Sequence, residues 1–364
     1  MRVAIDTTGV QVTQAGTTTY TNALLHALRE LPGGPEMVEV ACRQRFSRNH
    51  RLLRKADTLN RELFWLKDQL PRVLQQQSVD LVHCPTPHVP SRTRIPVVAT
   101  VHDLYVFHNP QAFPVWHRRA NIHFLKETIR RADHIMTISD YTRNDLLSRF
   151  GSHLESRVHL AYEAADESFL PPSSERKNDV RSRYKLPDSY LLSVATLEPR
   201  KNLDRLLDAF IRIADTIPHS LVLTGAQGWK TEHLQDKVKH SGFADRIQFL
   251  GHANFSDLPC LYAQAEVFCF PSLFEGFGLP ILEAMACGCP VLTSNVSSMP
   301  EIAGDASALV NPLDVEEIGA TLLALLQDEA WRSRLRVQGL ERAKQFSWKT
   351  CAEQTMAVYE KALG

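Results

Sequence analysis

Two glutamates and two glycines stand at a spacing that suggests binding of a sugar and a phosphate. Residues 267–295 read VFCFPSLFEGFGLPILEAMACGCPVLTSN: an apolar strand pattern, a loop with Glu275-Gly-Phe-Gly, and a helical pattern opened by Pro280. The glycines let backbone N–H groups approach a ligand closely, and a helix N-terminus behind them favours an anion. The amides in question belong to Gly276, Phe277, Gly278 and Leu279. We predict that Glu275 reaches a sugar and that Glu283, one turn into the helix, accepts hydrogen bonds from a ribose diol.

Two adjacent cations supply charge that a phosphate needs. Arg200 and Lys201 follow the strand pattern YLLSVA (190–195) and precede a helical pattern. Arg can grip a diphosphate with its planar fork while Lys acts as a point charge, and both would stabilise the charge that grows on a leaving diphosphate. Read alone, such a pair is more often a solvated helix start.

The first half of the chain offers a histidine and a glycine. The apolar run VVATVHDL (97–104) ends in His102-Asp103, and a histidine at a strand's carboxyl end can donate a hydrogen bond or move a proton near neutral pH. By itself it would more often cap the strand, and Asp103 is expected to orient the loop. The loop DTTGVQVTQAGTTTY (6–20) contains Gly16 and by itself can be a plain N-terminal loop.

Alternating strand and helix patterns must position these residues. Strands are predicted over 1–5, 38–42, 80–83, 97–100 and 134–138, and again over 190–195, 220–224, 247–250, 267–270 and 290–293, with helical patterns between them. Such alternation predicts α/β domains with parallel sheets covered by helices. The segment FLPPSSERKND (169–179) is typical of an interdomain linker. We therefore expect two doubly wound domains, 1–170 and 171–345, with the ligand in a cleft between their sheet edges.

Composition excludes several classes of protein. The 364 residues carry 41 Lys and Arg against 41 Asp and Glu, which argues against nucleic-acid binding by bulk charge. Seven cysteines, mostly in apolar runs, indicate buried free thiols in a reducing compartment. No apolar stretch reaches the roughly 18 residues that span a bilayer. We expect a soluble cytoplasmic protein that touches the inner membrane face at most peripherally.

One basic segment could make such a contact. Residues 43–72 carry nine Lys and Arg against three Asp and Glu, interleaved with Leu, Phe and Trp. The segment fits either an anionic lipid surface or an ordinary surface helix with its apolar face in the core.

The motifs together resemble the retaining glycosyltransferases of family 4, which have the GT-B fold of two Rossmann-like domains facing a cleft. The stretch 267–295 is similar to the family's E-x₇-E motif. The segment 193–210, SVATLEPRKNLDRLLDAF, is similar to the family's phosphate-binding segment, and the segment 300–312, PEIAGDASALVNP, is similar to the segment that usually follows the E-x₇-E motif. The resemblance covers nearly the whole chain, and in detail the motifs are similar to those of bacterial mannosyltransferases and related enzymes that build O-antigens and exopolysaccharides. The final stretch (346–364) resembles the family's last helix, which crosses back to pack on the first domain, and Trp348 and Tyr359 are expected to be core anchors and not ligand contacts. Thr196 stands where many members carry Arg, which leaves it a hydroxyl donor at most.

The resemblance implies a reaction and roles. It implies retaining transfer of a hexose, with α-mannose from GDP-mannose favoured, onto a cell-surface glycan or lipid-linked acceptor bound by the N-terminal domain, the C-terminal domain holding the donor. Lys201 and Arg200 would hold the diphosphate, Glu275 the donor sugar, and His102 would lie beside the reacting carbon. The loop 6–20 resembles the family's first glycine-containing loop, in which Gly16 would let the backbone pass against the donor diphosphate. A front-face displacement, in which the leaving phosphate helps to deprotonate the acceptor, is the mechanism usual for the family.

Alternatives remain open at this point. UDP-glucose, UDP-N-acetylglucosamine or a nucleotide-linked rhamnose could replace GDP-mannose, because no side chain here reads the base. A sugar-nucleotide epimerase shares the two-domain fold, and an inactive binding subunit is a third reading, although Glu275, Glu283 and Lys201 are all present. The chain has no D-x-D and no His, Asp and Glu spacing suited to a metal, so we expect metal-independent catalysis without a cofactor. The acceptor, the linkage and the oligomeric state are not predicted.

Overall fold

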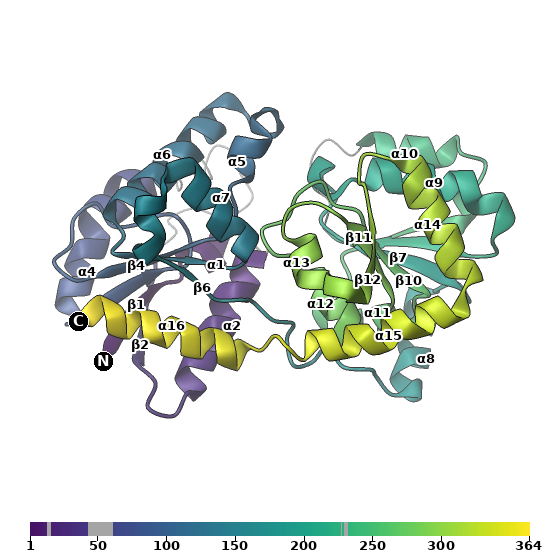
Figure 1. Cartoon of the computed structure of the whole chain (residues 1–364). Helices are drawn as coiled ribbons and strands as arrows, with labels where there is room; N and C mark the ends of the chain where they lie inside the picture. The colour runs from purple at the N-terminus through teal and green to yellow at the C-terminus, as the bar shows by residue number, and fades with distance from the viewer. Residues whose placement is uncertain (13–15, 43–60, 227, 229–231) are drawn as a thin grey trace. The chain divides into compact units, whose positions relative to one another are not determined.

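The chain folds into two compact units, each built around its own parallel sheet (Figure 1). The computed structural model describes residues 1–12, 16–42, 61–226, 228 and 232–364. The first unit comprises residues 1–163 and 347–364, and the second comprises 164–346. This confirms the predicted α/β class with two doubly wound sheets.

The sheet of the first unit has six strands in the order β2-β1-β3-β4-β5-β6. These strands are β1 (Arg2–Asp6), β2 (Glu36–Val40), β3 (Leu81–Cys84), β4 (Val97–Val101), β5 (His134–Thr137) and β6 (Val158–Leu160). Its helices are α1 (Thr8–Val12), α2 (Gly16–Glu30), η1 (Arg61–Gln69), α4 (Leu70–Gln76), α5 (Tyr105–His108), η2 (Pro110–Ala112), α6 (Val115–Arg131), α7 (Asp140–Phe150), η3 (Ser152–Arg157) and α16 (Trp348–Leu363).

The sheet of the second unit also has six strands, in the order β12-β11-β10-β7-β8-β9. They are β7 (Tyr190–Val194), β8 (Ser220–Thr224), β9 (Ile247–Gly251), β10 (Val267–Phe270), β11 (Val291–Ser294) and β12 (Ser307–Val310). The helices are α8 (Ser174–Tyr184), η4 (Pro199–Lys201), α9 (Leu203–Ile213), η5 (Ala214–Thr216), α10 (Glu232–Lys239), η6 (Ala244–Arg246), η7 (Phe255–Asp257), α11 (Leu258–Gln264), α12 (Leu279–Ala286), α13 (Met299–Ala303), η8 (Gly304–Ala306), α14 (Val315–Gln327) and α15 (Glu329–Ala343).

The second sheet has the strand order of a dinucleotide-binding fold. Counted from β7, the order read from the far edge is 3-2-1-4-5-6, with the reversal between β7 and β10. Ligands of open parallel sheets bind beyond the carboxyl ends of the strands at such a reversal. The loops that follow β7 and β10 are therefore where a site is expected.

Burial of apolar strands on both faces explains these sheets. All residues of β4 and β10 are buried, as expected for strands covered by helices on both sides (Figure 1). α9 shows how a helix covers such a face: its buried side consists of Leu203, Leu206, Leu207, Ala209, Phe210 and Ile213. Apolar burial on this scale is the main stabilising contribution of each unit.

The C-terminal helix α16 belongs to the first unit. It packs against α2, and both Trp348 and Tyr359 are buried core residues, as the sequence predicted for them. The hydroxyl of Tyr359 lies 2.6 Å from Nδ1 of His83 on β3, which ties the end of the chain to the centre of the first sheet.

The predicted linker over 169–179 is wrong. Phe169 is buried against Tyr262 and Phe255, and α8 begins at Ser174 with Ser173 as its N-cap. The units instead divide between residues 163 and 164 and between 346 and 347, whereas the sequence placed these divisions at 170 and 345. The short strands β6 and β12 and the helices α8 and α10 were also not predicted.

All seven cysteines are buried and none forms a disulfide. Among the residues that the structure describes, no helix is long and apolar enough to cross a membrane.

Candidate active site

Two loops of the second unit meet because their strands are neighbours. β7 pairs with β10, so the turn at Pro199–Lys201 and the loop that starts at Pro271 leave the same edge of the sheet side by side. The backbone joins them directly, since Leu273 N donates to the carbonyl oxygen of Arg200 at 2.8 Å. The predicted cation pair and the predicted sugar-binding glutamate therefore belong to one site.

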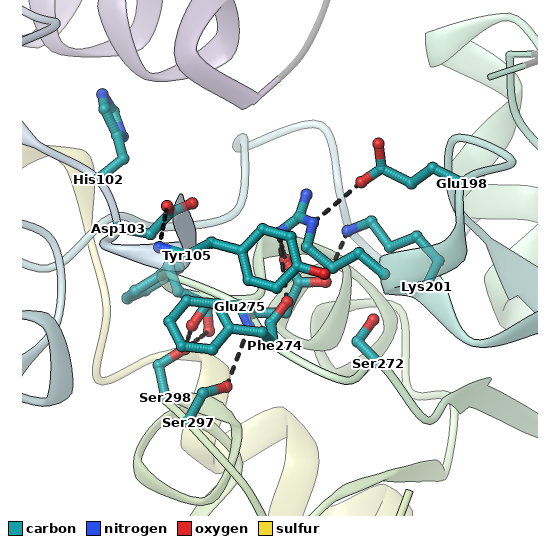
Figure 2. A network of polar contacts seen from close by, with 12 residues as sticks. His102, Asp103, Tyr105, Glu198, Lys201, Ser272, Phe274, Glu275, Ser297 and Ser298 are labelled. Atoms are coloured by element: carbon teal, nitrogen blue, oxygen red, sulfur yellow. Dashed lines mark hydrogen bonds and ion pairs between the residues drawn. The ribbon is translucent and has the colours of Figure 1, made fainter. Parts of the chain in front are cut away.

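Arg200, Lys201 and Glu275 form a largely buried ion cluster, of which Figure 2 labels Lys201 and Glu275. Lys201 Nζ donates to one carboxylate oxygen of Glu275 at 2.7 Å, and Arg200 Nη1 donates to the other at 2.9 Å. Arg200 Nε also donates to Glu198 at 3.0 Å. Glu275 is only 6% exposed, so each charge depends on its partners for the stabilisation that water would otherwise give.

The environment lowers the pKa values of both Glu275 and Lys201. Burial alone would raise the pKa of Glu275, but Arg200 and Lys201 outweigh it and hold the pKa of that carboxyl below its usual range. Burial lowers the pKa of Lys201, Arg200 adds to the lowering, and Glu275 only partly opposes both. Lys201 Nζ also lies 4.9 Å from the centre of the Phe270 ring. A bound diphosphate would bring negative charge to two cations that now share one carboxylate.

Asn202 fixes the turn that presents the cations. It takes the left-handed conformation with φ 60° and precedes the first residue of α9. Its side-chain amide donates to the carbonyl oxygens of Pro271 at 2.9 Å and Pro312 at 2.7 Å. One residue thus links the turn after β7 to the segments that follow β10 and β12.

Two serines hold the Glu275-Gly-Phe-Gly loop. Ser298 Oγ, fully buried, lies 3.0 Å from the carbonyl oxygen of Glu275 and 2.8 Å from that of Phe277, and Ser297 Oγ accepts from Glu275 N at 3.0 Å (Figure 2). Gly278 then takes φ 106°, a conformation that side-chain-bearing residues rarely adopt, and α12 begins at Leu279. The loop and the start of α12 are therefore positioned before any ligand binds.

Glu283 lies on α12 and pairs with a buried tyrosine. The hydroxyl of Tyr262, on α11, donates to Oε2 of Glu283 at 2.8 Å. Burial raises the pKa of Glu283 to about 7, an effect that Tyr262 opposes and Asp166 reinforces. The carboxyl group therefore changes charge near neutral pH.

His102 follows β4 in the first unit, and both of its ring nitrogens face acceptors. Nε2 lies 2.8 Å from the carbonyl oxygen of Pro85, which can only accept, so Nε2 carries a proton. Nδ1 lies 3.6 Å from the buried carboxylate of Glu163. Burial alone would lower the pKa of His102, but Glu163 outweighs it and the pKa is raised. Asp103 accepts from Tyr105 N at 2.9 Å, which fits the loop-orienting role predicted for it.

The structure gives less support to the roles predicted for Gly16, Thr196 and the basic segment 43–72. Gly16 begins α2 and is exposed, and a Cβ added there would meet no atom within 4 Å, so no close approach of the chain itself requires glycine at that position. Thr196 is exposed in the loop after β7. Most of the basic segment 43–72 lies outside the described residues; in its described part Trp65, Leu66 and Leu70 are buried in the core.

Sequence reasoning found the charges of the site but missed their partners. It did not single out Glu198, Asn202, Ser298, Tyr262 or Glu163. Asn202 had a usable signal, because an Asn just before an amphipathic helix is a common N-cap type. Ser298, Tyr262 and Glu163 are recognised only from contacts between segments far apart in the chain, such as the 3.0 Å contact of Ser298 with the carbonyl oxygen of Glu275, 23 residues apart. Glu198 lies two residues before Arg200, and its part is recognised only from the 3.0 Å bond between their side chains.

The arrangement in the second unit can bind a nucleoside diphosphate linked to a sugar. It combines two cations, a loop with glycines leading into a helix N-terminus, and two carboxylates, all in segments that follow β7 and β10. Cations fixed before the reaction stabilise charge that develops on a leaving diphosphate without moving a proton.

Comparison with known families covers both units. Residues 174–343 match the family described as "Glycosyl transferases group 1", and residues 15–169 match "Glycosyltransferase Family 4".

Individual relatives agree with these matches. The chain is 38% identical to O-antigen chain mannosyltransferase B of Escherichia coli over 283 residues, which is 77% of this chain and 74% of that protein. It is 33% identical to the serotype-specific mannosyltransferase WbdA of Escherichia coli over 291 residues, 78% of this chain but only 35% of that longer protein. A sucrose-phosphate synthase from Thermosynechococcus elongatus shares the fold, with a TM-score of 0.82 at 20% identity over 99% of this chain and 98% of that chain.

Proposed function

Because this chain belongs to the group 1, or family 4, glycosyltransferases and has the GT-B fold, we propose that it transfers an α-mannosyl residue from GDP-mannose to a growing cell-surface glycan. The transfer retains the configuration of the sugar. The acceptor is a polysaccharide or a lipid-linked oligosaccharide bound by the first unit, and the donor is held by the second.

One observation carries the donor site: the ion cluster of Arg200, Lys201 and Glu275 at the strand-order reversal of the second sheet. In the proposal, Lys201 and Arg200 bind the diphosphate, the amides of residues 276–279 support it, and Glu283 binds the ribose. Glu275 holds the donor sugar while it keeps the two cations aligned. The choice of mannose is supported by the 38% identity to an O-antigen mannosyltransferase.

His102 is the contribution of the first unit in this proposal. With Nε2–H directed at Pro85 and Nδ1 at Glu163, a protonated ring keeps a fixed positive charge. Such a charge near the reacting carbon would stabilise the departing diphosphate. The cations of the site supply the electrostatic stabilisation that a metal–diphosphate complex gives elsewhere, so we propose that no metal ion is required.

The proposed reaction belongs to a reducing cytoplasm. All seven cysteines are buried and none forms a disulfide, a pattern typical of proteins from reducing compartments. A peripheral contact of residues 43–72 with the inner membrane face would suit a lipid-linked acceptor and stays a proposal.

A transfer assay tests the function. The purified protein is incubated with GDP-mannose and short α-mannan acceptors in the presence of EDTA, and the product is examined by mass spectrometry and by NMR of the new anomeric proton. We expect a product one hexose longer, with an α-linkage and undiminished yield in EDTA. Transfer from UDP-glucose, UDP-N-acetylglucosamine or a nucleotide-linked rhamnose instead would contradict mannose as the sugar.

A further inference from the structure

We propose that Tyr262 is a positioning residue that makes Glu283 a reader of the donor ribose. The inference rests on the proposed function, because it assumes that the second unit binds a nucleoside diphosphate sugar. It adds a residue and a pH dependence that the family motif alone does not contain.

The contact between the two side chains is specific. Tyr262 is fully buried on α11, and its hydroxyl lies 2.8 Å from Oε2 of Glu283 on α12. Among the residues that the structure describes, this is the one hydrogen bond that the Glu283 carboxylate receives. The bond fixes one oxygen of the carboxylate and leaves Oε1 as the atom that can accept from a ribose diol.

Neighbouring aromatic rings pack against Tyr262 and restrict the movement of its hydroxyl group. Phe268 on β10 lies edge-on to it with ring centres 5.1 Å apart, and the ring centre of Phe169 lies 6.0 Å from that of Tyr262. Burial raises the pKa of Tyr262 far above neutrality, so the hydroxyl keeps its proton and can only donate to an ionised Glu283.

The charges around Glu283 explain why this donor matters. Burial and Asp166 favour the neutral carboxyl, and the free thiol of Cys287 follows at the end of α12 without adding a cation. Of the groups that act on Glu283, only the Tyr262 hydroxyl favours the anion. Without it, Glu283 would be protonated at neutral pH and would accept hydrogen bonds from a diol less strongly.

Two tyrosine variants separate positioning from general packing. Tyr262→Phe removes the hydroxyl and keeps the ring. Tyr190→Phe is the matched control, because Tyr190 is equally buried and its hydroxyl donates to the carbonyl oxygen of Leu261 on the same helix at 2.7 Å. Glu283→Gln is the reference in which the carboxylate itself is lost.

The experiment measures binding of GDP, 2′-deoxy-GDP and 3′-deoxy-GDP by calorimetry between pH 6 and pH 9, with UDP forms if the wild type prefers UDP. All forms of one nucleotide carry the same diphosphate, so the ratio of their affinities cancels the titration of the phosphate. We expect the wild type at pH 8 to prefer the ribonucleotide about tenfold over a deoxy form, the worth of one hydrogen bond to a charged group. That preference should fall below pH 7.

Tyr262→Phe should lose most of the ribose preference at pH 7 and regain it by pH 9, whereas Tyr190→Phe should follow the wild type. Glu283→Gln should show little preference at any pH. An unchanged preference and unchanged pH midpoint in Tyr262→Phe would overturn the inference and leave the proposed function standing. If the wild type binds no nucleoside diphosphate at all, the proposed function and this inference fail together.

Discussion

At the scale of single residues, Glu275 has two tasks that a substitution can separate. It neutralises Arg200 and Lys201 in the free protein, and in the proposed function it also holds the donor sugar. Glu275→Gln should lower the free energy of unfolding by about 3 kcal/mol, because Lys201 and Arg200, both largely buried, lose the carboxylate that they share, and Arg200 keeps only Glu198. Sugar transfer should be abolished, since the sugar contact and the alignment of the cations are both lost.

GDP should bind to Glu275→Gln more tightly than to the wild type, although stability and sugar transfer are lost. With the competing carboxylate gone, Arg200 and Lys201 should attract the diphosphate more strongly, so GDP should raise the melting temperature of Glu275→Gln more than that of the wild type. Glu266→Gln, which removes a carboxylate 3.6 Å from Arg332, serves as the control. Weaker GDP binding in Glu275→Gln than in the control would show that Glu275 does not compete with the diphosphate.

Lys201 should matter for affinity more than for stability. Lys201→Met keeps most of the apolar stem and the contact with Phe270 while removing the charge. We expect GDP affinity to fall about tenfold or more, the loss of a charged contact to phosphate. Lys237→Met, which removes a lysine bound to Asp204 and Asp208, should leave that affinity unchanged. Equal affinities in the two variants, measured by calorimetry, would remove Lys201 from the site.

Glu283 gives the free protein a pH dependence. Its pKa of about 7 lies above the usual value of 4.5, so the folded state holds its proton more tightly than the unfolded chain. This contribution to stability is present in full below pH 4.5 and is lost as the pH rises through 7, amounting to about 3 kcal/mol.

Glu283→Gln should therefore raise the melting temperature at pH 8 relative to the wild type and have little effect at pH 4.5. The surface variant Glu341→Gln, at a side chain 65% exposed, should show no such difference between the two pH values. If Glu283→Gln lowered the melting temperature at pH 8, the carboxylate would have a stabilising partner that this account omits.

At the scale of elements, the conformation of the loop between β10 and α12 depends on the backbone angles of Gly278. Gly278 has φ 106°, and a Cβ there would lie 3.1 Å from Ile281 on α12. Gly278→Ala should cost about 1–3 kcal/mol of stability and displace the amides at the start of α12. Gly242→Ala is the control, because Gly242 has φ 79° with open space around it. Both variants should melt earlier, but only Gly278→Ala should lose GDP affinity.

The helices and strands also show which parts of the fold can be predicted from the sequence alone. Long apolar strands and amphipathic helices such as α9 were predicted within a few residues, because periodicity reports burial. β6 has only three residues. β12 is as long as β10 and β11 but is not buried throughout, so it lacks the continuous apolar run by which those two strands were predicted. The Pro171-Pro172 pair was interpreted as a linker, although proline also precedes helices and α8 begins two residues later.

The site was predicted as a set of residue types and not as a set of contacts. Arg200, Lys201 and Glu275 were singled out correctly as charges beside a sheet edge, but their pairing depends on β7 lying next to β10. The strand order is a property of the whole sheet and cannot be predicted from the local sequence between residues 201 and 275. For the same reason Tyr262 could not be connected with Glu283 in advance.

At the scale of the molecule, each unit carries part of the proposed reaction on its own sheet. The second unit has the strand order and the charged loops of a nucleotide site, and the first unit, completed by α16, carries His102 and Glu163. The central claim is that the second unit binds GDP-mannose through its own cations, without a metal ion.

A thermal-shift panel tests that claim most directly. GDP, UDP and dTDP, each with its sugar conjugates, are added to the intact protein in EDTA, and a ligand at a hundred times its Kd should add about 2.7 kcal/mol of stability. We predict that GDP and GDP-mannose raise the melting temperature and that the other nucleotides do so much less. Stabilisation by UDP or dTDP compounds alone would contradict GDP-mannose as the donor, and no stabilisation by any of them would contradict a donor site in this protein.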